Sequence, residues 1–281
     1  MHYPNIDPVI LSLGPVAIRW YGLAYLAAFG ACWWLGNRQT ERRFPDWTRQ
    51  QVSDVVFYGA LGAVLGGRLG YVLFYGFDSL LRDPMVVLRI WDGGMSFHGG
   101  LIGTAAALWW FGRKTGKTIW QVGDFVVPLV PIGLGFGRLG NFANTELPGR
   151  MTESGWGLVY PCSVDAIRSI NPLCSGAWET FARHPSPLYQ ALAEGAVLFA
   201  FVWWFAARPR PSGMISGAFL TGYGCLRFVT EQFREPDGHL GFIAFDWLTM
   251  GQLLSLPMVI VGILIVAWAK RSEAGTIRPR R

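Results

Sequence analysis

The stretch GRLGNFANTELPGR, residues 137–150, brings one arginine, two asparagines and a glutamate into an otherwise apolar region. Arg138 and Asn141 are three residues apart, so they share one face of a helix. A guanidinium presents a planar fork of donors that suits a phosphate, and Asn141 could bind the same ligand or fix the arginine. Asn144 and Glu146 follow where the helix should end. A structural Arg–Glu pair at a helix end is the alternative, but the convergence of these side chains favours an anion site.

A histidine lies among small residues in SFHGGLIG, residues 96–103. A helix that began near Trp91 would place His98 roughly 10 Å along the apolar run. A lone histidine in a helix is more often structural, but small neighbours let a backbone or a ligand approach closely. We therefore expect a functional role, and an unperturbed imidazole pKa of about 6.5 suits a proton acceptor.

A third polar group lies in GYGCLRFVTEQFRE, residues 222–235. Tyr223, Arg227 and Glu231 follow each other at intervals of four residues, so they share a helix face. Glu231 could be the counterion of Arg227, because an unpaired charge inside an apolar helix is very costly. A buried salt bridge that only fixes helix packing is the alternative. Tyr21, in RWYG, fits either an interfacial aromatic belt or a cavity wall, and the sequence favours neither.

The composition indicates that a membrane surrounds these side chains. Hydrophobic residues make up 52% of the 281 residues and charged residues only 15%, against about 25% charged in soluble proteins. Seven apolar runs approach the roughly 20 residues that a helix needs to span a bilayer. They lie at about 16–36, 55–75, 93–111, 119–139, 187–207, 214–234 and 248–268. The predicted fold is an all-α polytopic membrane protein with seven transmembrane helices.

The basic residues predict the orientation of these helices. The segments 37–51, 112–118, 206–213 and 269–281 hold 14 Lys and Arg, whereas 1–15, 76–92, 140–186 and 235–247 hold five. The positive-inside rule then places the N-terminus outside and the C-terminus in the cytoplasm. The first 15 residues have no basic start and contain three prolines, so we expect an interfacial arm and not a signal peptide. Short basic clusters in place of one stripe argue against nucleic acid as a partner.

We expect residues 1–281 to form a single transmembrane domain, with 140–186 as an ordered cap on its outer side. A loop of that length is usually functional or disordered, and its aromatic residues and prolines favour order. Cys162 and Cys174 both lie in it. They could form a disulfide if the outer side is oxidising, and the sequence leaves that open.

Small residues and prolines predict local features of two spans. Gly62, Gly66 and Gly70 recur every four residues, which is a pattern of close helix packing. Arg68 lies among them and is expected to snorkel to the headgroups. Pro128 and Pro131 should kink or break the fourth span.

Two arginines, a histidine, an asparagine and a glutamate near one leaflet suggest a pocket for a phospholipid headgroup. The motifs that contain them are IRWYG, GGRLGYVLFY, WDGGMSFHGGLIG, GRLGNFANTELPGR, HPSPLYQ, GYGCLRFVTEQFREPD and MGQLLSLPM. Together they resemble the family of phosphatidylglycerol–prolipoprotein diacylglyceryl transferases over nearly the whole chain. The resemblance implies an enzyme of the bacterial inner membrane, with its active site toward the periplasm. Its partners would be phosphatidylglycerol, the lipobox segment of a prolipoprotein and membrane lipids.

The implied reaction moves the diacylglyceryl group of phosphatidylglycerol to the lipobox cysteine, forms a thioether and releases glycerol-1-phosphate. It needs a thiolate, because a free cysteine has a pKa of about 8.5, and it needs stabilisation of the departing phosphate. His98 is the candidate base, and Arg138 and Arg227 are the candidates for the phosphate. An Arg-linked group that activates the thiol, with His98 structural, is the alternative. No metal or organic cofactor is expected.

The resemblance assigns further residues to substrate binding. It implies that Arg138, Asn141 and Glu146 bind phosphatidylglycerol and that Arg227 is essential. Gly149 and Tyr21 match further functional positions of the family. Tyr223 and Glu231 are expected to orient Arg227.

Two other classes of protein remain as alternatives. A headgroup phosphotransferase usually needs clustered carboxylates that hold Mg²⁺, but Asp92, Asp124, Asp237 and Asp246 are scattered. A lipid or anion transporter would show internal symmetry and a charged site near the bilayer midplane, and the sequence shows no internal repeat.

Overall fold

The computed structural model describes residues 1–13, 16–236 and 241–276, so Asp237 and the last five residues of the basic tail lie outside the described residues. The chain divides into two compact units. The first comprises Met1–Cys32 and Val126–Arg281, and the second comprises Trp33–Phe125. Helices dominate both. The single transmembrane domain expected from the sequence stays a prediction.

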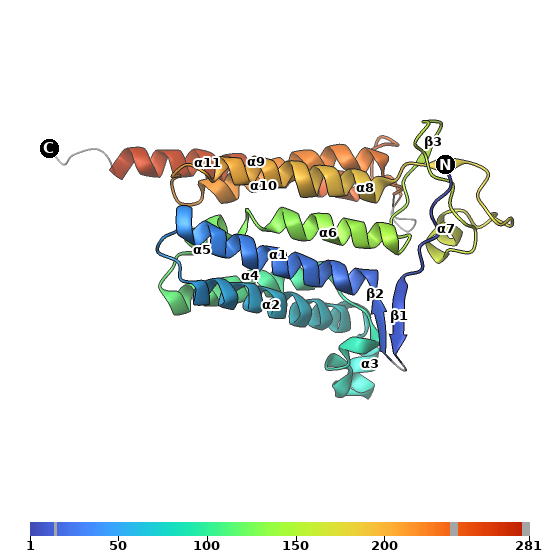
Figure 1. Cartoon of the computed structure of the whole chain (residues 1–281), viewed down its shortest axis with the longest axis horizontal. Helices are drawn as coiled ribbons and strands as arrows, with labels where there is room; N and C mark the ends of the chain where they lie inside the picture. The colour runs from blue at the N-terminus through green and yellow to red at the C-terminus, as the bar shows by residue number, and fades with distance from the viewer. Residues whose placement is uncertain (14–15, 237–240, 277–281) are drawn as a thin grey trace. The chain divides into compact units, whose positions relative to one another are not determined.

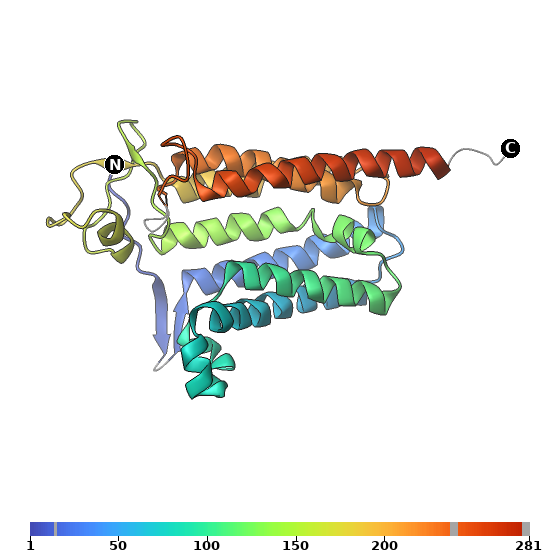
Figure 2. The same cartoon turned by 180° about the vertical axis from the view of Figure 1, so that it is seen from behind.

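The second unit is built on a close pair of helices, α2 (Arg49–Tyr75) and α4 (Phe97–Thr115), which run side by side (Figures 1 and 2). Glycines line their contact. A Cβ on Gly66 would lie 2.8 Å from the Gly103 Cα, and a Cβ on Gly70 would lie 2.8 Å from the Gly99 Cα. The spacing of Gly62, Gly66 and Gly70 therefore predicted close helix packing correctly.

A connection of short elements joins these two helices and encloses Arg68. It contains α3 (Phe77–Arg82), η1 (Pro84–Val87) and η2 (Ile90–Asp92). Arg68 is only 3% exposed. Its Nη2 donates to the Val86 carbonyl at 2.6 Å, and its Nη1 donates to the carbonyls of Gly93 and Gly94. The expectation that Arg68 snorkels is wrong, because these carbonyls satisfy the guanidinium inside the protein.

The first unit opens with a hairpin of β1 (Val9–Leu13) and β2 (Val16–Arg19), which pair antiparallel. The helix α1 (Trp20–Arg42) follows and continues into the second unit. The first predicted span, 16–36, therefore begins four residues too early. β-branched residues on both arms of the hairpin favour strand over helix there.

The rest of the first unit is a set of helices. They are α6 (Val130–Ala143), α8 (Ser186–Gln190), the π-helical turn η3 (Ala191–Val197), α9 (Leu198–Phe205), α10 (Met214–Thr230), η4 (Glu231–Phe233) and α11 (Met250–Thr276). The helices α10 and α11 run alongside each other (Figure 1). The helical path is interrupted between α5 (Ile119–Val126), which ends the second unit, and α6, so the expected break beside Pro128 and Pro131 is confirmed.

Three helical stretches are long and apolar enough to cross a membrane. They are Arg49–Tyr75, Ser186–Phe205 and Met250–Ser272, and α5 with α6 makes a fourth if the broken pair counts as one span. Each of the seven predicted runs contains helix in the described residues. The chain is thus a mostly helical protein with apolar, membrane-crossing helices, and the number of seven spans stays a prediction.

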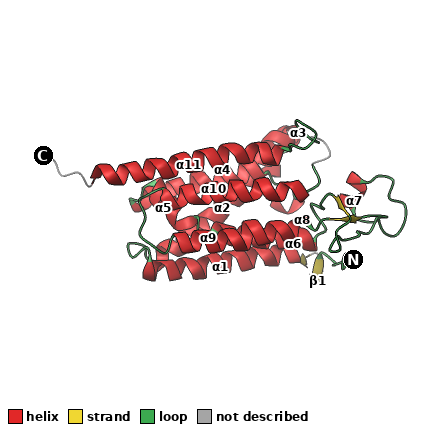
Figure 3. Ribbon diagram, turned by 90° about the horizontal axis from the view of Figure 1, so that it is seen from above, coloured by secondary structure: helices red, strands yellow, loops and turns green. Residues whose placement is uncertain are grey.

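The segment 140–186 folds as loops with α7 (Asp165–Ile170) and the short pair β3 (Met151–Thr152) and β4 (Ala182–Arg183), as Figure 3 shows. It has its own small core of Tyr3, Leu158, Tyr160 and Ile167. Burial raises the pKa of the Tyr160 hydroxyl. A disulfide joins Cys162 and Cys174. The segment is folded in the described residues, and its place as a cap on the outer side stays a prediction.

Candidate functional site

Two arginines that lie far apart in the sequence meet at one buried carboxylate. Glu194 is fully buried. Its Oε2 lies 3.5 Å from the Arg138 Nη2, and its Oε1 lies 3.3 Å from the Arg227 Nη1. Thr230 donates its hydroxyl to the same Oε1 at 2.9 Å. The structure thus brings Arg138 and Arg227 together, as the sequence predicted, through a residue that the sequence analysis did not single out.

The helix that carries Glu194 is locally widened. Glu194 lies at the centre of the π-helical turn η3, and such turns are rare and often occur at functional sites. The following residue, Gly195, lies against Gly135 of α6, where a Cβ on Gly195 would meet the Gly135 Cα at 2.7 Å. Two glycines therefore let the helices approach closely, and that approach places Glu194 within reach of Arg138.

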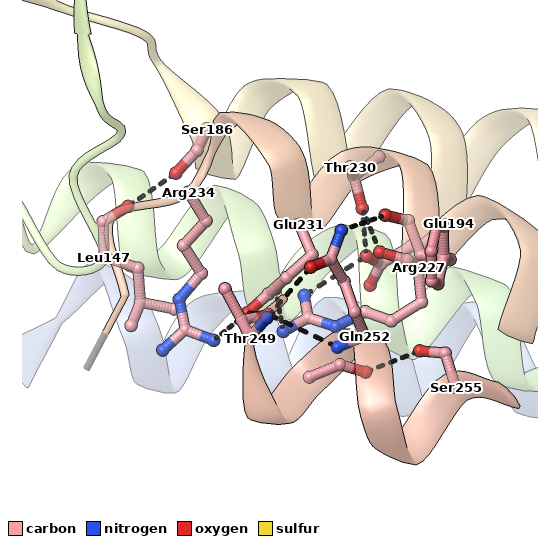
Figure 4. A network of polar contacts seen from close by, with 12 residues as sticks. Leu147, Ser186, Glu194, Arg227, Thr230, Glu231, Arg234, Thr249, Gln252 and Ser255 are labelled. Atoms are coloured by element: carbon pink, nitrogen blue, oxygen red, sulfur yellow. Dashed lines mark hydrogen bonds and ion pairs between the residues drawn. The ribbon is translucent and has the colours of Figure 1, made fainter. Parts of the chain in front are cut away.

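Arg227 is held from two sides. Its Nη2 lies 2.6 Å from Glu231 Oε2, while its Nη1 faces Glu194 (Figure 4). Glu231 also lies 3.7 Å from the Arg234 Nη1 and accepts a hydrogen bond from the Thr249 hydroxyl at 3.3 Å. The predicted counterion role of Glu231 is confirmed. The alternative of a buried salt bridge describes the same geometry, so the contact alone does not separate packing from function.

Tyr223 lies one turn before Arg227 on α10. Its hydroxyl interacts electrostatically with Glu194, Arg227 and Arg138, and its ring stacks on Phe219 at 6.0 Å. Tyr223 therefore belongs to the same cluster, and an orienting effect on Arg227 stays a prediction.

The end of α6 gathers the other polar residues of its motif. The buried Asn141 donates its Nδ2 to Glu146 Oε2 at 2.6 Å, and Asn144 donates to Glu146 Oε1 at 3.2 Å. The helix ends at Ala143 with Asn144 as its C-cap, where the sequence predicted the end. Glu146 pairs with two amides and not with Arg138, so the structural Arg–Glu alternative is wrong for this pair.

The loop after α6 has a strained backbone. Thr145 and Leu147 both have positive φ, 57° and 55°. Such conformations are costly for residues other than glycine and cluster at functional sites. They hold the Glu146 carboxylate back toward Asn141, which lies five residues earlier.

Tyr21 packs on α6 and interacts electrostatically with the cluster. A Cβ on Gly140 would lie 2.5 Å from its ring, so Gly140 makes room for the ring. Its hydroxyl interacts electrostatically with Glu146 and Arg138 and lies 3.3 Å from the Tyr25 hydroxyl. The sequence left open an interfacial aromatic belt or a cavity wall for Tyr21, and these contacts fit a side chain that lines the site.

Gly149 lies where chain segments cross. Its N–H donates to the His184 carbonyl at 3.0 Å, and a Cβ there would collide with that carbonyl and lie 2.6 Å from the Phe233 carbonyl. His184 Nδ1 lies 3.2 Å from the Tyr189 hydroxyl, and burial lowers the pKa of the His184 imidazole. Only glycine fits position 149, so a packing requirement accounts for this residue.

His98 belongs to the second unit, whereas Arg138 and Arg227 belong to the first. It lies in the first turn of α4, which begins at Phe97 after Ser96 as N-cap. Residues 93–96 are not helical, so the depth expected for a helix from Trp91 is wrong. The side chain is exposed, and its ring lies edge-on to Phe97 with 5.5 Å between the ring centroids.

The ion pairs of the cluster leave the donors of one arginine for an anion. Arg138, Glu194, Arg227, Glu231 and Arg234 form a connected series of ion pairs. Among the described residues, the Arg138 guanidinium makes no hydrogen bond, so its donors are available to a ligand. No group of three or more metal-ligating His, Cys, Asp or Glu occurs in the same described ranges.

Comparisons with known proteins give a family match over most of the chain. Residues 8–268 match the family model of prolipoprotein diacylglyceryl transferase. A protein of Chromohalobacter salexigens is 52% identical over 278 residues, which is 98% of this chain and 97% of that protein. Relatives from Vibrio cholerae and Pseudomonas aeruginosa are 51% and 49% identical over 96% and 97% of this chain, and over 93% and 97% of their own lengths. All three relatives are named phosphatidylglycerol–prolipoprotein diacylglyceryl transferase.

Proposed function

Because the chain belongs to the prolipoprotein diacylglyceryl transferase family, we propose that it transfers the diacylglyceryl group of phosphatidylglycerol to a prolipoprotein cysteine. The sulfur forms a bond to the glyceryl CH₂ carbon. The bond from that carbon to the phosphate oxygen breaks, and glycerol-1-phosphate leaves with the electron pair. The observation that carries the proposal is the convergence of Arg138 and Arg227 on the buried Glu194.

The two arginines have different parts in this reaction. Arg138 makes no hydrogen bond within the described residues, so it binds the phosphate of the lipid directly. Arg227 is held by two carboxylates at 3.3 and 2.6 Å, so it supplies a fixed positive charge. Both stabilise the charge that develops on the departing phosphate. Asn141 and Glu146 line the same end of α6 and bind the headgroup.

The thiol must lose its proton before it attacks the carbon. His98 is the candidate base, because its exposed imidazole has no hydrogen bond within the described residues. The Arg-linked alternative would use Glu194. That carboxylate already faces Arg138, Arg227 and Thr230, which favours His98.

We further propose seven spans in a bacterial inner membrane, with the N-terminus and the site on the periplasmic side. The distribution of Lys and Arg, 14 against five, supports this orientation. The Cys162–Cys174 disulfide supports it too, because disulfides persist in oxidising compartments such as the periplasm. The lipobox cysteine of the preprotein would then reach the site near the outer surface.

A transfer assay tests the reaction and the site. Purified protein in detergent receives phosphatidylglycerol and a synthetic lipobox peptide, with EDTA present. Peptide mass and released glycerol phosphate are followed for the wild type and for His98→Ala, Arg138→Ala and Arg227→Ala. The exposed carboxylate variant Glu153→Gln is the control.

A gain of one diacylglyceryl mass by the wild type, lost with either arginine, is the expected result. Residual turnover by His98→Ala that no longer depends on pH near 7 supports the base role. Full activity of that variant would make His98 a structural residue. A wild type that is inactive in EDTA and regains activity with Mg²⁺ would refute the metal-free transferase and favour a phosphotransferase.

A further inference from the structure

Gln190 is a buried amide without a partner. The side chain is fully buried. Neither its Oε1 nor its Nε2 has a hydrogen-bond partner among the described residues. Buried polar groups are almost always paired, and leaving one unpaired costs about 1–3 kcal/mol. A buried amide whose donor and acceptor are both unpaired is therefore a candidate for binding a ligand.

Gln252 shows what a structural buried amide looks like. Gln252 is also fully buried. Its Oε1 accepts from the Thr249 N–H at 2.9 Å, and its Nε2 donates to the Phe228 carbonyl at 3.5 Å (Figure 4). Gln252 thus has a partner at each end, whereas Gln190 has none.

The neighbours of Gln190 locate it within the first unit. Ser186, Gln190 and Glu194 are four residues apart, are all fully buried, and so share one face of the helix. Ser186 donates its hydroxyl to the Leu147 carbonyl at 2.7 Å (Figure 4), while Glu194 reaches Arg138. Gln190 therefore lies between the loop after α6 and the arginine pair.

A second unpaired atom lies on that loop. The Asn144 Oδ1 is buried and has no hydrogen-bond partner in the described part of the chain, although its Nδ2 donates to Glu146. Unpaired acceptors on Gln190 and Asn144, with an unpaired donor on Gln190, occur at the same end of α6. Such a set of unpaired donors and acceptors is suited to binding hydroxyl groups, because a hydroxyl both donates and accepts a hydrogen bond.

We propose that the Gln190 amide recognises the glycerol hydroxyls of the phospholipid headgroup and so determines headgroup specificity. This rests on the proposed function, in which Arg138 and Arg227 hold the phosphate. Gln190 and Glu194 are four residues apart, which separates them by on the order of 5 Å along the helix axis. A glycerol headgroup extends over a similar distance from its phosphate. The amide donates to one hydroxyl and accepts from the next, and headgroups without hydroxyls leave it unpaired.

The experiment compares two lipids of equal charge. Phosphatidylglycerol and phosphatidylethanol carry the same phosphodiester anion, but only the first has headgroup hydroxyls. Binding is measured as the lipid-dependent rise in the melting temperature of the detergent-solubilised protein, over a range of lipid concentrations. We expect the wild type to prefer phosphatidylglycerol by about tenfold.

Gln190→Met keeps the length of the side chain and removes the amide. We expect the preference to fall to about one, with no loss of stability in the absence of lipid, because two unpaired groups are removed. Gln190→Asn withdraws the amide by one methylene and should also lose most of the preference. The matched control Gln252→Met leaves two backbone partners unpaired, so it should lower stability and keep the preference.

A wild type that binds both lipids equally would overturn the proposal, as would a preference that survives in Gln190→Met or in Gln190→Asn. Failure of the proposed function gives a different result. In that case the wild type transfers no diacylglyceryl group in the peptide assay, whatever its headgroup preference.

Discussion

Neutralising Glu194 tests the centre of the charge cluster. In Glu194→Gln, an amide nitrogen takes the place of one carboxylate oxygen and faces a guanidinium, so donor meets donor. Removing one partner of a buried ion pair costs about 3–5 kcal/mol. Arg227 keeps Glu231 at 2.6 Å, whereas Arg138 loses its only carboxylate at 3.5 Å. We therefore expect the lower end of that range, about 3 kcal/mol, or about a hundredfold in the folding equilibrium.

The assay is thermal unfolding in detergent with and without an added anion. A loss of about 3 kcal/mol corresponds to a fall of about 6–12 °C in melting temperature. With Glu194 neutral, the cluster carries one more positive charge than in the wild type. Glycerol phosphate should therefore restore more stability to the variant than it adds to the wild type. The exposed Glu153→Gln makes the same charge change and should shift stability by no more than about 0.5 kcal/mol.

Equal stability of Glu194→Gln and the wild type would refute the reasoning, because it would mean that Glu194 does not balance the arginines. A large loss of stability without any rescue by the anion would also count against it. That result would show a packing role in which the added positive charge attracts no ligand.

Two further predictions concern the loop and the cap. Gly149→Ala places a Cβ against the carbonyls of His184 and Phe233. Urea unfolding should show a free energy of unfolding that is lower by about 2 kcal/mol, and the peptide assay should show reduced transfer. Cys162→Ser or Cys174→Ser opens a loop of 12 residues and should cost about 2–3 kcal/mol. Reductant should lower the free energy of unfolding of the wild type by the same amount and leave that of the variants unchanged. A wild type whose stability does not change with reductant would contradict this.

Features that depend on local spacing were predictable from the sequence. Four-residue spacing placed Glu231 against Arg227, and the end of the apolar pattern placed Glu146 beside Asn141. The first contact follows from the 3.6-residue period of a helix, which fixes neighbours without knowledge of the fold. The second follows from the predicted end of the helix before Glu146.

Features that depend on contacts between distant segments were not predictable. Glu194 stands out as an acid in an apolar run, which is a signal of function that the sequence analysis did not use. Its partners depend on the widened turn η3 and on the close contact of Gly135 with Gly195, and no local pattern reports either. The prediction that Arg68 snorkels was wrong for a similar reason. Its partners are backbone carbonyls, which every residue has, so the sequence does not indicate which of them will lie near the guanidinium.

The unequal surroundings of the two arginines suit a reaction in which negative charge grows on a leaving group. A phosphodiester carries one negative charge, and the Arg138 guanidinium has donors for it because it makes no hydrogen bond within the described residues. As the carbon–oxygen bond breaks, the phosphate gains a second charge, which needs a donor already in place. Arg227 cannot move far, because two carboxylates hold it, and it therefore provides a preorganised charge. Arg138 has only the longer contact to Glu194, so it can turn toward the phosphate without breaking a hydrogen bond. A site with two equally fixed arginines would bind the ground state as firmly as the transition state, and only the difference between the two accelerates the reaction.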